Sequence, residues 1–296
     1  MKRETNFRLQ VMLGSLLWAC ATARAAETTP IAEVEYRLDG KLIFVELAVN
    51  GRPPVWFCVD SGAPHSVIDP AYAAQLDLKV ISASTATGTG QGAVPVGKAA
   101  AVRLQLGGAS WDVAEPWIID LSQVPIPKDT KGLIGFDLLR SYVVRIDPTR
   151  KRLAVFAPER FQPPQTGARL PLIIDNDKLF VDATLVVRPD YRVQRRLRID
   201  TGSETSVNDE SVKESPTRRK TTLGNGLGAN FESISGVFDA VHLGPFTFRN
   251  VWGPGGPGSF IGMELLRRFV VTFDVRNRWL YLEPTNAIDE IVPAPS

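Results

Sequence analysis

Cysteine and histidine are the rarest residues of this sequence, at two each among 296 residues. Cys20 lies in an N-terminal segment that we expect to be removed, so Cys58 would be the one cysteine left and no intramolecular disulfide could form. Cys58 lies in an apolar run, and we interpret it as a small buried hydrophobic residue. Stability must therefore come from packing rather than from covalent cross-links.

The scarcity of histidine argues against several kinds of catalysis. His65 lies near Asp60, but neither Ser61 nor Ser66 stands in a Gly-x-Ser-x-Gly motif, which argues against a Ser-His-Asp hydrolase. The other histidine, His242, has no neighbour at metal-ligand spacing. No Cys pair or Asp-rich calcium loop is present either, so we expect neither a metal nor a cofactor.

The chain also lacks an excess of charge of either sign. Its 34 Lys and Arg residues against 32 Asp and Glu give a net charge of +2, which provides no broad attraction to nucleic acid or to an anionic membrane. We interpret two basic clusters as a solvated strand face and a solvated loop. They comprise Arg192, Arg195, Arg196 and Arg198, and Arg218, Arg219 and Lys220.

The N-terminal segment is typical of a secretory signal peptide. Basic residues precede the apolar run 11–19, and Ala23-Arg24-Ala25 follows as a cleavage site, so we expect residues 1–25 to be removed and the protein to be exported to the periplasm. The run is too short to span a bilayer, so no transmembrane segment is expected after cleavage. The alternative is a lipoprotein anchored through Cys20.

The rest of the chain is divided by 24 Gly and 22 Pro into short runs of Val, Ile, Leu and Phe, which favours many short strands. Strands are predicted at 41–51 and 55–59, and again, with a longer turn between them, at 178–187 and 196–199. Each pair runs into an acidic loop. The two loops are Asp60-Ser61-Gly62-Ala63 and Asp200-Thr201-Gly202-Ser203.

A second similarity between the two halves lies further along each of them. Residues 132–147 align without gaps on residues 259–274, with Ile, Gly, Leu-Leu-Arg, Val-Val and Asp in common. Repeated features in the same order indicate an internal duplication. We predict a first lobe at 31–157, a linker at 158–167, a second lobe at 168–284 and a frayed tail at 285–296. Asp147 and Asp274, at the ends of the repeats, are predicted to be structural turn residues.

The acidic loops are the candidate catalytic residues. If a pseudo-twofold axis relates the lobes, Asp60 and Asp200 face each other, and two such close carboxylates cannot both ionise at modest cost. The Ser61 and Thr201 hydroxyls could bond to backbone across the interface, and Gly62 and Gly202 allow tight turns. Which Asp would be the base and which the acid stays open at this point.

These features resemble the aspartic peptidase family, both its bacterial retropepsin-like members and its single-chain pepsin-like members. The resemblance rests on 59–63 with 133–135, and on 199–203 with 260–262. It implies an all-β fold of two pseudo-twofold-related barrel lobes with a cleft between them. It also implies that a water between Asp60 and Asp200 attacks the peptide bond, and that Ile134, Gly135, Ile261 and Gly262 support the Asp loops.

By the same resemblance, two glycine-rich segments would be flaps that close over an extended peptide. The flap residues predicted are Gly88, Gly90, Gly224 and Gly226. The sequence thus predicts a monomeric aspartic endopeptidase acting on a peptide or unfolded protein. The alternative from another class is a peptide-binding protein of the same fold with little or no hydrolytic activity, since Ser61 replaces the more usual Thr and no flap tyrosine is present.

Overall fold

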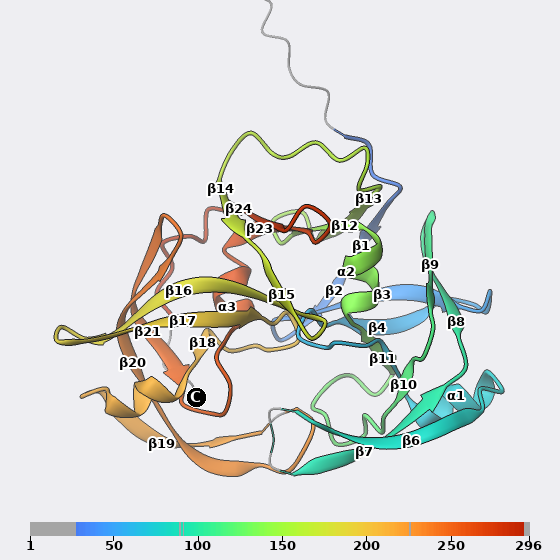
Figure 1. The fold of residues 1–296 in the computed structure, drawn as a ribbon, viewed down its shortest axis with the longest axis horizontal. Helices are drawn as coiled ribbons and strands as arrows, with labels where there is room; N and C mark the ends of the chain where they lie inside the picture. Colours follow the sequence, from blue (N-terminus) through green and yellow to red (C-terminus); the bar gives the residue numbers. More distant parts are fainter. Residues whose placement is uncertain (1–27, 89, 91, 225, 293–296) are drawn as a thin grey trace, which may run out of the picture.

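The computed structural model describes residues 28–292 except 89, 91 and 225 (Figure 1). The predicted signal peptide 1–25 and the lipidation of Cys20 lie outside these residues. Three sheets account for most of the chain, one to the right, one to the left and one at the top of the view. The all-β fold predicted from the spacing of Gly and Pro is thus confirmed.

The first half of the chain builds a ten-stranded sheet in which the buried strand β4, Val55–Val59, lies between β3, Leu42–Val49, and β11, Thr130–Ile134. Strands β3 and β4, which correspond to the strands predicted at 41–51 and 55–59, form an antiparallel hairpin, and β11 joins β4 in parallel. The other strands of this sheet are β2 (Arg37–Asp39), β5 (Val67–Ile68), β6 (Val80–Thr87), β7 (Ala93–Ala99), β8 (Val102–Leu106), β9 (Ala109–Val113) and β10 (Trp117–Ile118).

The second half repeats this arrangement in an eight-stranded sheet. Strand β17, Tyr191–Ile199, pairs antiparallel with β16, Lys178–Arg188, and in parallel with β22, Phe260–Ile261. The other strands are β15 (Ile173–Asp175), β18 (Val207–Asn208), β19 (Arg218–Leu223), β20 (Phe231–Leu243) and β21 (Phe246–Pro254).

A six-stranded sheet takes strands from both halves, in the order β1 (Ala32–Glu35), β13 (Arg152–Phe156), β12 (Val143–Asp147), β23 (Phe269–Asp274), β24 (Trp279–Pro284) and β14 (Ala168–Pro171). At its centre β12 and β23 are antiparallel, with Val144 opposite Phe273 and Ile146 opposite Val271. In the repeat alignment Val144 corresponds to Val271 and Ile146 to Phe273, so the pairing exchanges equivalent residues. The predicted pseudo-twofold axis therefore passes between these two strands.

Short helices complete the described residues: α1 (Pro70–Gln75), α2 (Phe136–Ser141), α3 (Met263–Leu266) and the 3₁₀ helix η1 (Glu210–Glu214). Helices α2 and α3 occupy equivalent places in the repeat, directly after Gly135 and Gly262. No helix in the described ranges is long and apolar enough to cross a membrane. The main apolar core runs through both halves and includes Ile134, Ile199 and Ile261, so the Asp loops rest on a continuous hydrophobic base.

Two local expectations are wrong. Strand β17 begins at Tyr191 rather than at 196, so a tight turn joins it to β16 in place of the longer turn. The tail is also packed rather than frayed over the described residues that follow Pro284. Arg268, which is 1% exposed, donates to the carbonyls of Ile288 and Glu290, and the side chain of Val292 is buried. The lobe boundaries stay a prediction, because the six-stranded sheet takes strands from both halves.

Candidate active site

Asp60 and Asp200 occupy equivalent positions, each directly after the buried end of a central strand. The Asp60 amide donates to the carbonyl of Ile134 at 2.9 Å, and the Asp200 amide donates to that of Ile261 at 3.0 Å. Pairing in parallel with β11 and β22 thus fixes the backbone at the point where each carboxylate emerges. The structure places Ile134 and Ile261 where the resemblance to aspartic peptidases put them, beside the Asp loops.

Gly135 and Gly262 let the chain approach the Asp loops closely. A Cβ at Gly135 would lie 2.6 Å from the backbone of His65, and one at Gly262 would lie 2.5 Å from the carbonyl oxygen of Thr205. These distances leave no room for a side chain. The first residues of the helices that follow then bind the loops, since Phe136 N donates to Ala63 O at 2.9 Å and Met263 N donates to Ser203 O at 2.7 Å.

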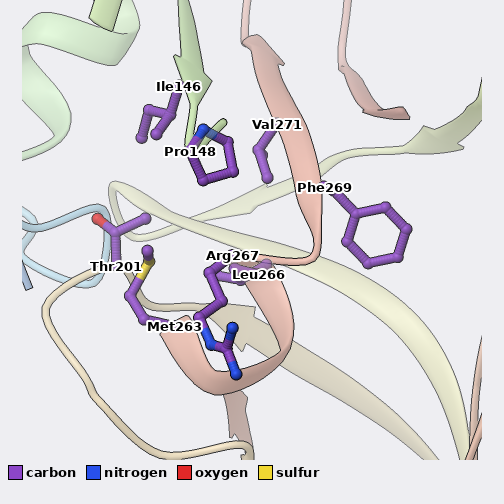
Figure 2. A pocket seen from close by; sticks show the side chains of 8 residues that line it. All are labelled: Ile146, Pro148, Thr201, Met263, Leu266, Arg267, Phe269 and Val271. Carbon is purple, nitrogen blue, oxygen red and sulfur yellow. The ribbon is translucent and has the colours of Figure 1, made fainter. Parts of the chain in front are cut away.

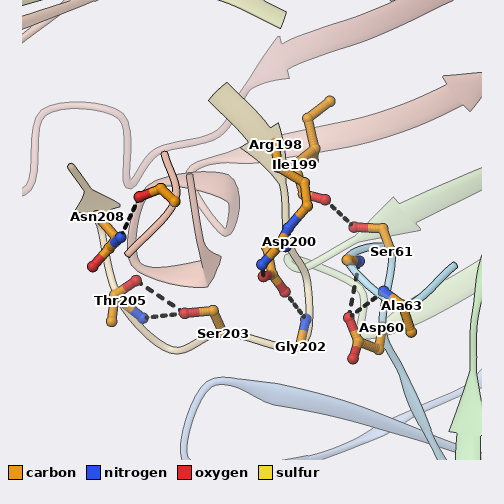
Figure 3. A network of polar contacts seen from close by, with 12 residues as sticks. Asp60, Ser61, Ala63, Arg198, Ile199, Asp200, Gly202, Ser203, Thr205 and Asn208 are labelled. Carbon is orange, nitrogen blue, oxygen red and sulfur yellow. Dashed lines mark hydrogen bonds and ion pairs between the residues drawn. The ribbon is translucent and has the colours of Figure 1, made fainter. Parts of the chain in front are cut away.

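Four hydrogen bonds lock the two Asp loops to each other. Figure 3 shows one of them, between Ser61 and Ile199. The Ser61 hydroxyl donates to the carbonyl of Ile199 at 2.8 Å and accepts from the Thr201 amide at 3.0 Å. The Thr201 hydroxyl donates to the carbonyl of Val59 at 2.8 Å and accepts from the Ser61 amide at 2.9 Å. Both hydroxyls are buried. We call these four bonds the interloop lock, and they have the reciprocal form that a pseudo-twofold axis requires.

The lock places each carboxylate against the glycine of the opposite loop. A Cβ added to Gly62 would lie 2.6 Å from Cγ of Asp200, and one added to Gly202 would lie 2.4 Å from Cγ of Asp60. Each glycine also has a role in its own loop, because Gly62 N donates to Asp60 Oδ1 at 2.9 Å and Gly202 N donates to Asp200 Oδ1 at 3.1 Å. The two Asp loops therefore interlock, with no side chain between the carboxylates and the facing backbone.

Asp60 holds its proton far above the pH at which an ordinary aspartate loses it. Burial, followed by the negative charge of Asp200, raises the pKa of Asp60 from 3.8 to about 7. The positive charge of Arg198 and the Gly62 and Ala63 amides act in the opposite direction and are too weak to cancel the rise. At mildly acid pH, Asp60 is thus a neutral carboxylic acid that can donate a hydrogen bond.

This raised pKa predicts how stability depends on pH. A group whose pKa is higher in the folded than in the unfolded chain stabilises the fold below its unfolded pKa, and that contribution is lost as the pH rises through the folded pKa. The contribution of Asp60 to the free energy of unfolding should therefore fall by about 3 kcal/mol between pH 4 and pH 7. In D60N this loss should disappear. Urea unfolding at pH 4.5, 6 and 8 measures the difference.

A matched control is D129N, because Asp129 is exposed and its pKa is lowered by a hydrogen bond from Arg37. Its contribution has the opposite sign, so D129N should leave the fall in stability between pH 4 and pH 7 in place. Retention of that fall in D60N would show that the proton is not held at Asp60.

Arg198 was not predicted to be part of the site, and its interpretation as part of a solvated face is wrong. Its Nη2 lies 2.6 Å from Oδ2 of Asp200. The sequence spacing could have predicted this contact. Residues two apart in a strand share a face, and Arg198 stands two residues before Asp200. The same interpretation fails for Arg195, which pairs with the buried Asp209 at 2.8 Å. Residues 218–220 lie in strand β19 rather than in a loop.

The predicted flaps are the β6–β7 and β19–β20 hairpins, which run toward each other along the lower edge of the molecule in Figure 1. Their tips touch, since Gly90 N donates to the carbonyl of Leu227 at 2.9 Å. A Cβ on Gly88 or Gly90 would lie within 2.6 Å of Leu227 or Gly228. Leu227 and Gly228 lie within the second predicted flap segment, 224–228, but the contact between the two tips was not predicted, because such a contact leaves no periodic pattern in the sequence.

The other two predicted flap glycines, Gly224 and Gly226, lie near the contact between the hairpin tips. Gly224 has a φ of +116° and turns the chain back against Asn230. Gly226 lies one residue before the Leu227 that meets the first hairpin. The two hairpins form a closed pair in this structure, one contributed by each half of the chain.

A small apolar cavity lies beside the second Asp loop, between the six-stranded sheet and α3 (Figure 2). Both halves line it, with Ile146, Pro148, Thr201, Met263, Leu266, Arg267, Phe269 and Val271. Neither Asp60 nor Asp200 reaches it, so it belongs to the packing that supports Thr201 and not to the surroundings of the carboxylates.

Asp147 and Asp274, the acids that end the repeats, are turn residues as predicted. Asp147 accepts hydrogen bonds from the amides of Thr149 and Arg150. Asp274 accepts from Asn277. Cys58 is buried as predicted, and His65 stacks against the ring of Trp117 at 4.6 Å rather than joining a Ser-His-Asp arrangement.

The match to a protein-family model agrees with this geometry. Residues 45–138, which include the Asp60 loop, β11 and the start of α2, match the family model described as aspartyl protease. Among solved structures the chain is similar to the crystal structure of basic 7S globulin from soybean, with 14% identity over 86% of this chain and 94% of that chain and a TM-score of 0.48. No curated protein matches the chain significantly.

A duplicated all-β fold whose halves join two Asp-[Ser/Thr]-Gly loops is the arrangement that the sequence resemblance implied. The family match adds that the first of these loops lies in a segment of aspartyl protease type. The resemblance to aspartic peptidases drawn from the motifs is thus confirmed for the segment 45–138.

Proposed function

We propose that the protein is an aspartic endopeptidase that hydrolyses peptide bonds with a water bound between Asp60 and Asp200. The observation that carries the proposal is the interloop lock, which sets each carboxylate against the glycine of the opposite loop. A pair of acids held in this way can share one proton, because the second ionisation is opposed by the first.

The reaction needs no covalent intermediate. The ionised carboxylate takes a proton from the water as its oxygen attacks the peptide carbonyl, and the protonated carboxyl donates its proton to the carbonyl oxygen. In the second step the carboxyl that took the water proton passes it to the amide nitrogen, and the C–N bond breaks. The carboxylate that served as the acid recovers its proton from a hydroxyl of the tetrahedral intermediate. A carboxylic acid and an amine leave, and the enzyme returns to its starting state.

The substrate would be an extended peptide or unfolded protein lying between the Asp loops and the two hairpin tips. The contact between Gly90 and Leu227 would have to open for it to enter, and closure behind it would exclude water and strengthen polar contacts. We further propose that the protein acts as a monomer after export to the periplasm, either free or anchored through Cys20.

A second candidate function is peptide binding with little or no hydrolysis. The observation that favours it is the contact of Arg198 with Oδ2 of Asp200, because this ion pair occupies one of the four carboxylate oxygens that would hold the water. On this alternative the fold would bind an extended chain without cleaving it.

A cleavage assay decides between the peptidase and the peptide-binding protein. In it, a protein of residues 26–296 is incubated with a reduced and alkylated polypeptide between pH 3 and pH 8. We expect cleavage in mildly acid buffer, unaffected by a serine-directed sulfonyl fluoride or by a metal chelator. Products separated by mass spectrometry would report the bonds cut. Binding of the polypeptide with no product at any pH would favour the second candidate and contradict the first.

A further inference from the structure

The two carboxylates have unequal surroundings, although the loops that hold them are equivalent. Oδ2 of Asp200 receives Nη2 of Arg198 at 2.6 Å, a charge-assisted hydrogen bond of the strong kind. Among the described residues, Asp60 receives only backbone amides, from Gly62 at 2.9 Å and Ala63 at 3.2 Å. Within the part of the chain that the structure describes, Arg198 is thus the one side chain that donates to either carboxylate.

Arg198 is held in place by its strand. It pairs with Phe260 across β17 and β22, and its guanidinium lies 5.2 Å from the centre of the Phe260 ring. Its side chain is only 22% exposed, so its charge is poorly screened by solvent. The corresponding residue in the first half is Cys58, two residues before Asp60 and paired with Leu133. Cys58 is uncharged, because burial raises the pKa of its thiol well above the usual value.

We infer that Arg198 fixes the single proton of the pair on Asp60, so that Asp200 is the carboxylate that activates the water and Asp60 is the acid that polarises the peptide carbonyl. This inference rests on the proposed function and deepens it. Arg198 is a positioning residue here, since it acts on the proton through Asp200 and not on the substrate.

The balance of charges supports this assignment. A buried carboxylate beside a guanidinium is stabilised in its ionised form, and a second carboxylate close to it is then driven to stay neutral. The pKa of Asp60 is raised to about 7 by burial and by the charge of Asp200, which agrees with a proton resident on Asp60.

The charged groups acting on Asp60 are Asp200 and Arg198, with the neutral thiol of Cys58 on its own strand. Nearby titratable groups in the two loops are engaged elsewhere. His65 stacks on Trp117, and Glu204 accepts from the amide of Lys41.

With this assignment, each proton transfer of the reaction belongs to one of the two carboxyl groups. Asp200 takes the water proton, and Oδ1 can receive it because the Gly202 amide uses one of its two lone pairs. Asp60 gives its proton to the carbonyl oxygen. On collapse of the tetrahedral species, Asp200 returns its proton to the leaving nitrogen and Asp60 recovers one from the hydroxyl. Asp60 thus ends protonated and Asp200 ionised, as before.

The test follows the two carboxyl groups directly by ¹³C NMR of the full chain labelled at aspartate side-chain carboxyls. Spectra of D60N and D200N assign the two signals. In the wild type we expect the Asp60 signal to titrate between pH 5 and pH 8, with the Asp200 signal that of a carboxylate over this range. In R198Q both signals should move in this interval, because the proton is then shared.

Two further variants control the experiment. R198K keeps a positive charge and should restore most of the wild-type pattern. R196Q makes the same change on the same strand at an exposed residue, and it should leave both signals unchanged. If R198Q fails to fold, the wild-type spectra still test the inference, because they show which of the two carboxyl groups carries the proton. A proton on Asp200 in the wild type, or an R198Q titration equal to that of the wild type, would overturn the inference.

This readout separates the inference from the proposed function, because the titration needs no turnover. A chain that shows the expected signals and cleaves no peptide would refute the peptidase and leave the role of Arg198 standing. If cleavage occurs, kcat/KM of R198Q at pH 5 should fall about tenfold and its pH profile should shift upward by about one unit. A peptidase with an unshifted profile in R198Q would refute the inference alone.

Discussion

Replacing either Asp60 or Asp200 by Asn should lower kcat by about 10³-fold, with KM changed far less. An amide can neither accept the water proton as a carboxylate does nor donate an acidic proton to the carbonyl oxygen. Because both residues act on the same step, the double variant should be little slower than either single one. Initial rates on one cleaved peptide, taken at several substrate concentrations, measure all three.

Asn is a suitable substitution because it is nearly isosteric with Asp and should preserve the conformation of the loop. Its carbonyl oxygen can still accept the Gly62 or Gly202 amide that each Asp now binds. The matched controls are D147N and D274N, which change the acids that end the two repeats and whose side chains accept hydrogen bonds from the turns that follow them. These should retain wild-type turnover per folded molecule. Wild-type turnover in D60N or D200N would exclude the water-between-acids mechanism.

Much of the site could be predicted because it depends on repeated local patterns. The short apolar run 55–59 before Asp60 favours a buried strand, and an Ile-Gly pair follows each loop in the same order of features. The duplication then predicts that Asp60 and Asp200 lie opposite each other, because two equivalent loops are related by the pseudo-twofold axis. A single loop could not have predicted this pairing. The placement of Ser61 and Thr201 in the interloop lock follows from this symmetry alone.

The features that were not predicted depend on contacts that occur in only one half of the chain. Arg198 has no charged counterpart at Cys58, so symmetry gave no reason to separate it from the neighbouring arginines. Residues 191–195 alternate exposed and partly exposed side chains at the outer end of a long hairpin, so they lack the apolar pattern that indicates a strand. The packing of the tail was not predicted because nothing in the sequence indicates that Arg268, 20 residues before Ile288, is buried and binds it.

The interloop lock should be the most costly polar feature to remove from the fold. In S61A the Thr201 amide and the Ile199 carbonyl lose their partners, and in T201A the same happens to the Ser61 amide and the Val59 carbonyl. Each variant thus leaves two buried backbone groups unsatisfied, and we expect each to lower the free energy of unfolding by about 2–4 kcal/mol. Turnover should fall as well, because the carboxylates lose their relative position.

The two halves provide their own conservative controls, since one uses Ser and the other Thr at the same position. S61T and T201S retain the hydroxyl and should cost less than about 1 kcal/mol. T205A removes a hydroxyl whose hydrogen bond, to Ser203 at 2.9 Å, stays within one loop, and it should cost about as little.

The double variant S61A/T201A separates a cooperative lock from two independent bonds. Once one hydroxyl is lost the loops can part and admit water, so removal of the second leaves fewer groups unsatisfied than it would in the intact protein. The combined loss of stability should therefore be smaller than the sum of the single losses by about 1 kcal/mol or more. Strict additivity in urea unfolding, or single losses no larger than that of T205A, would mean that apolar packing alone holds the two acids together.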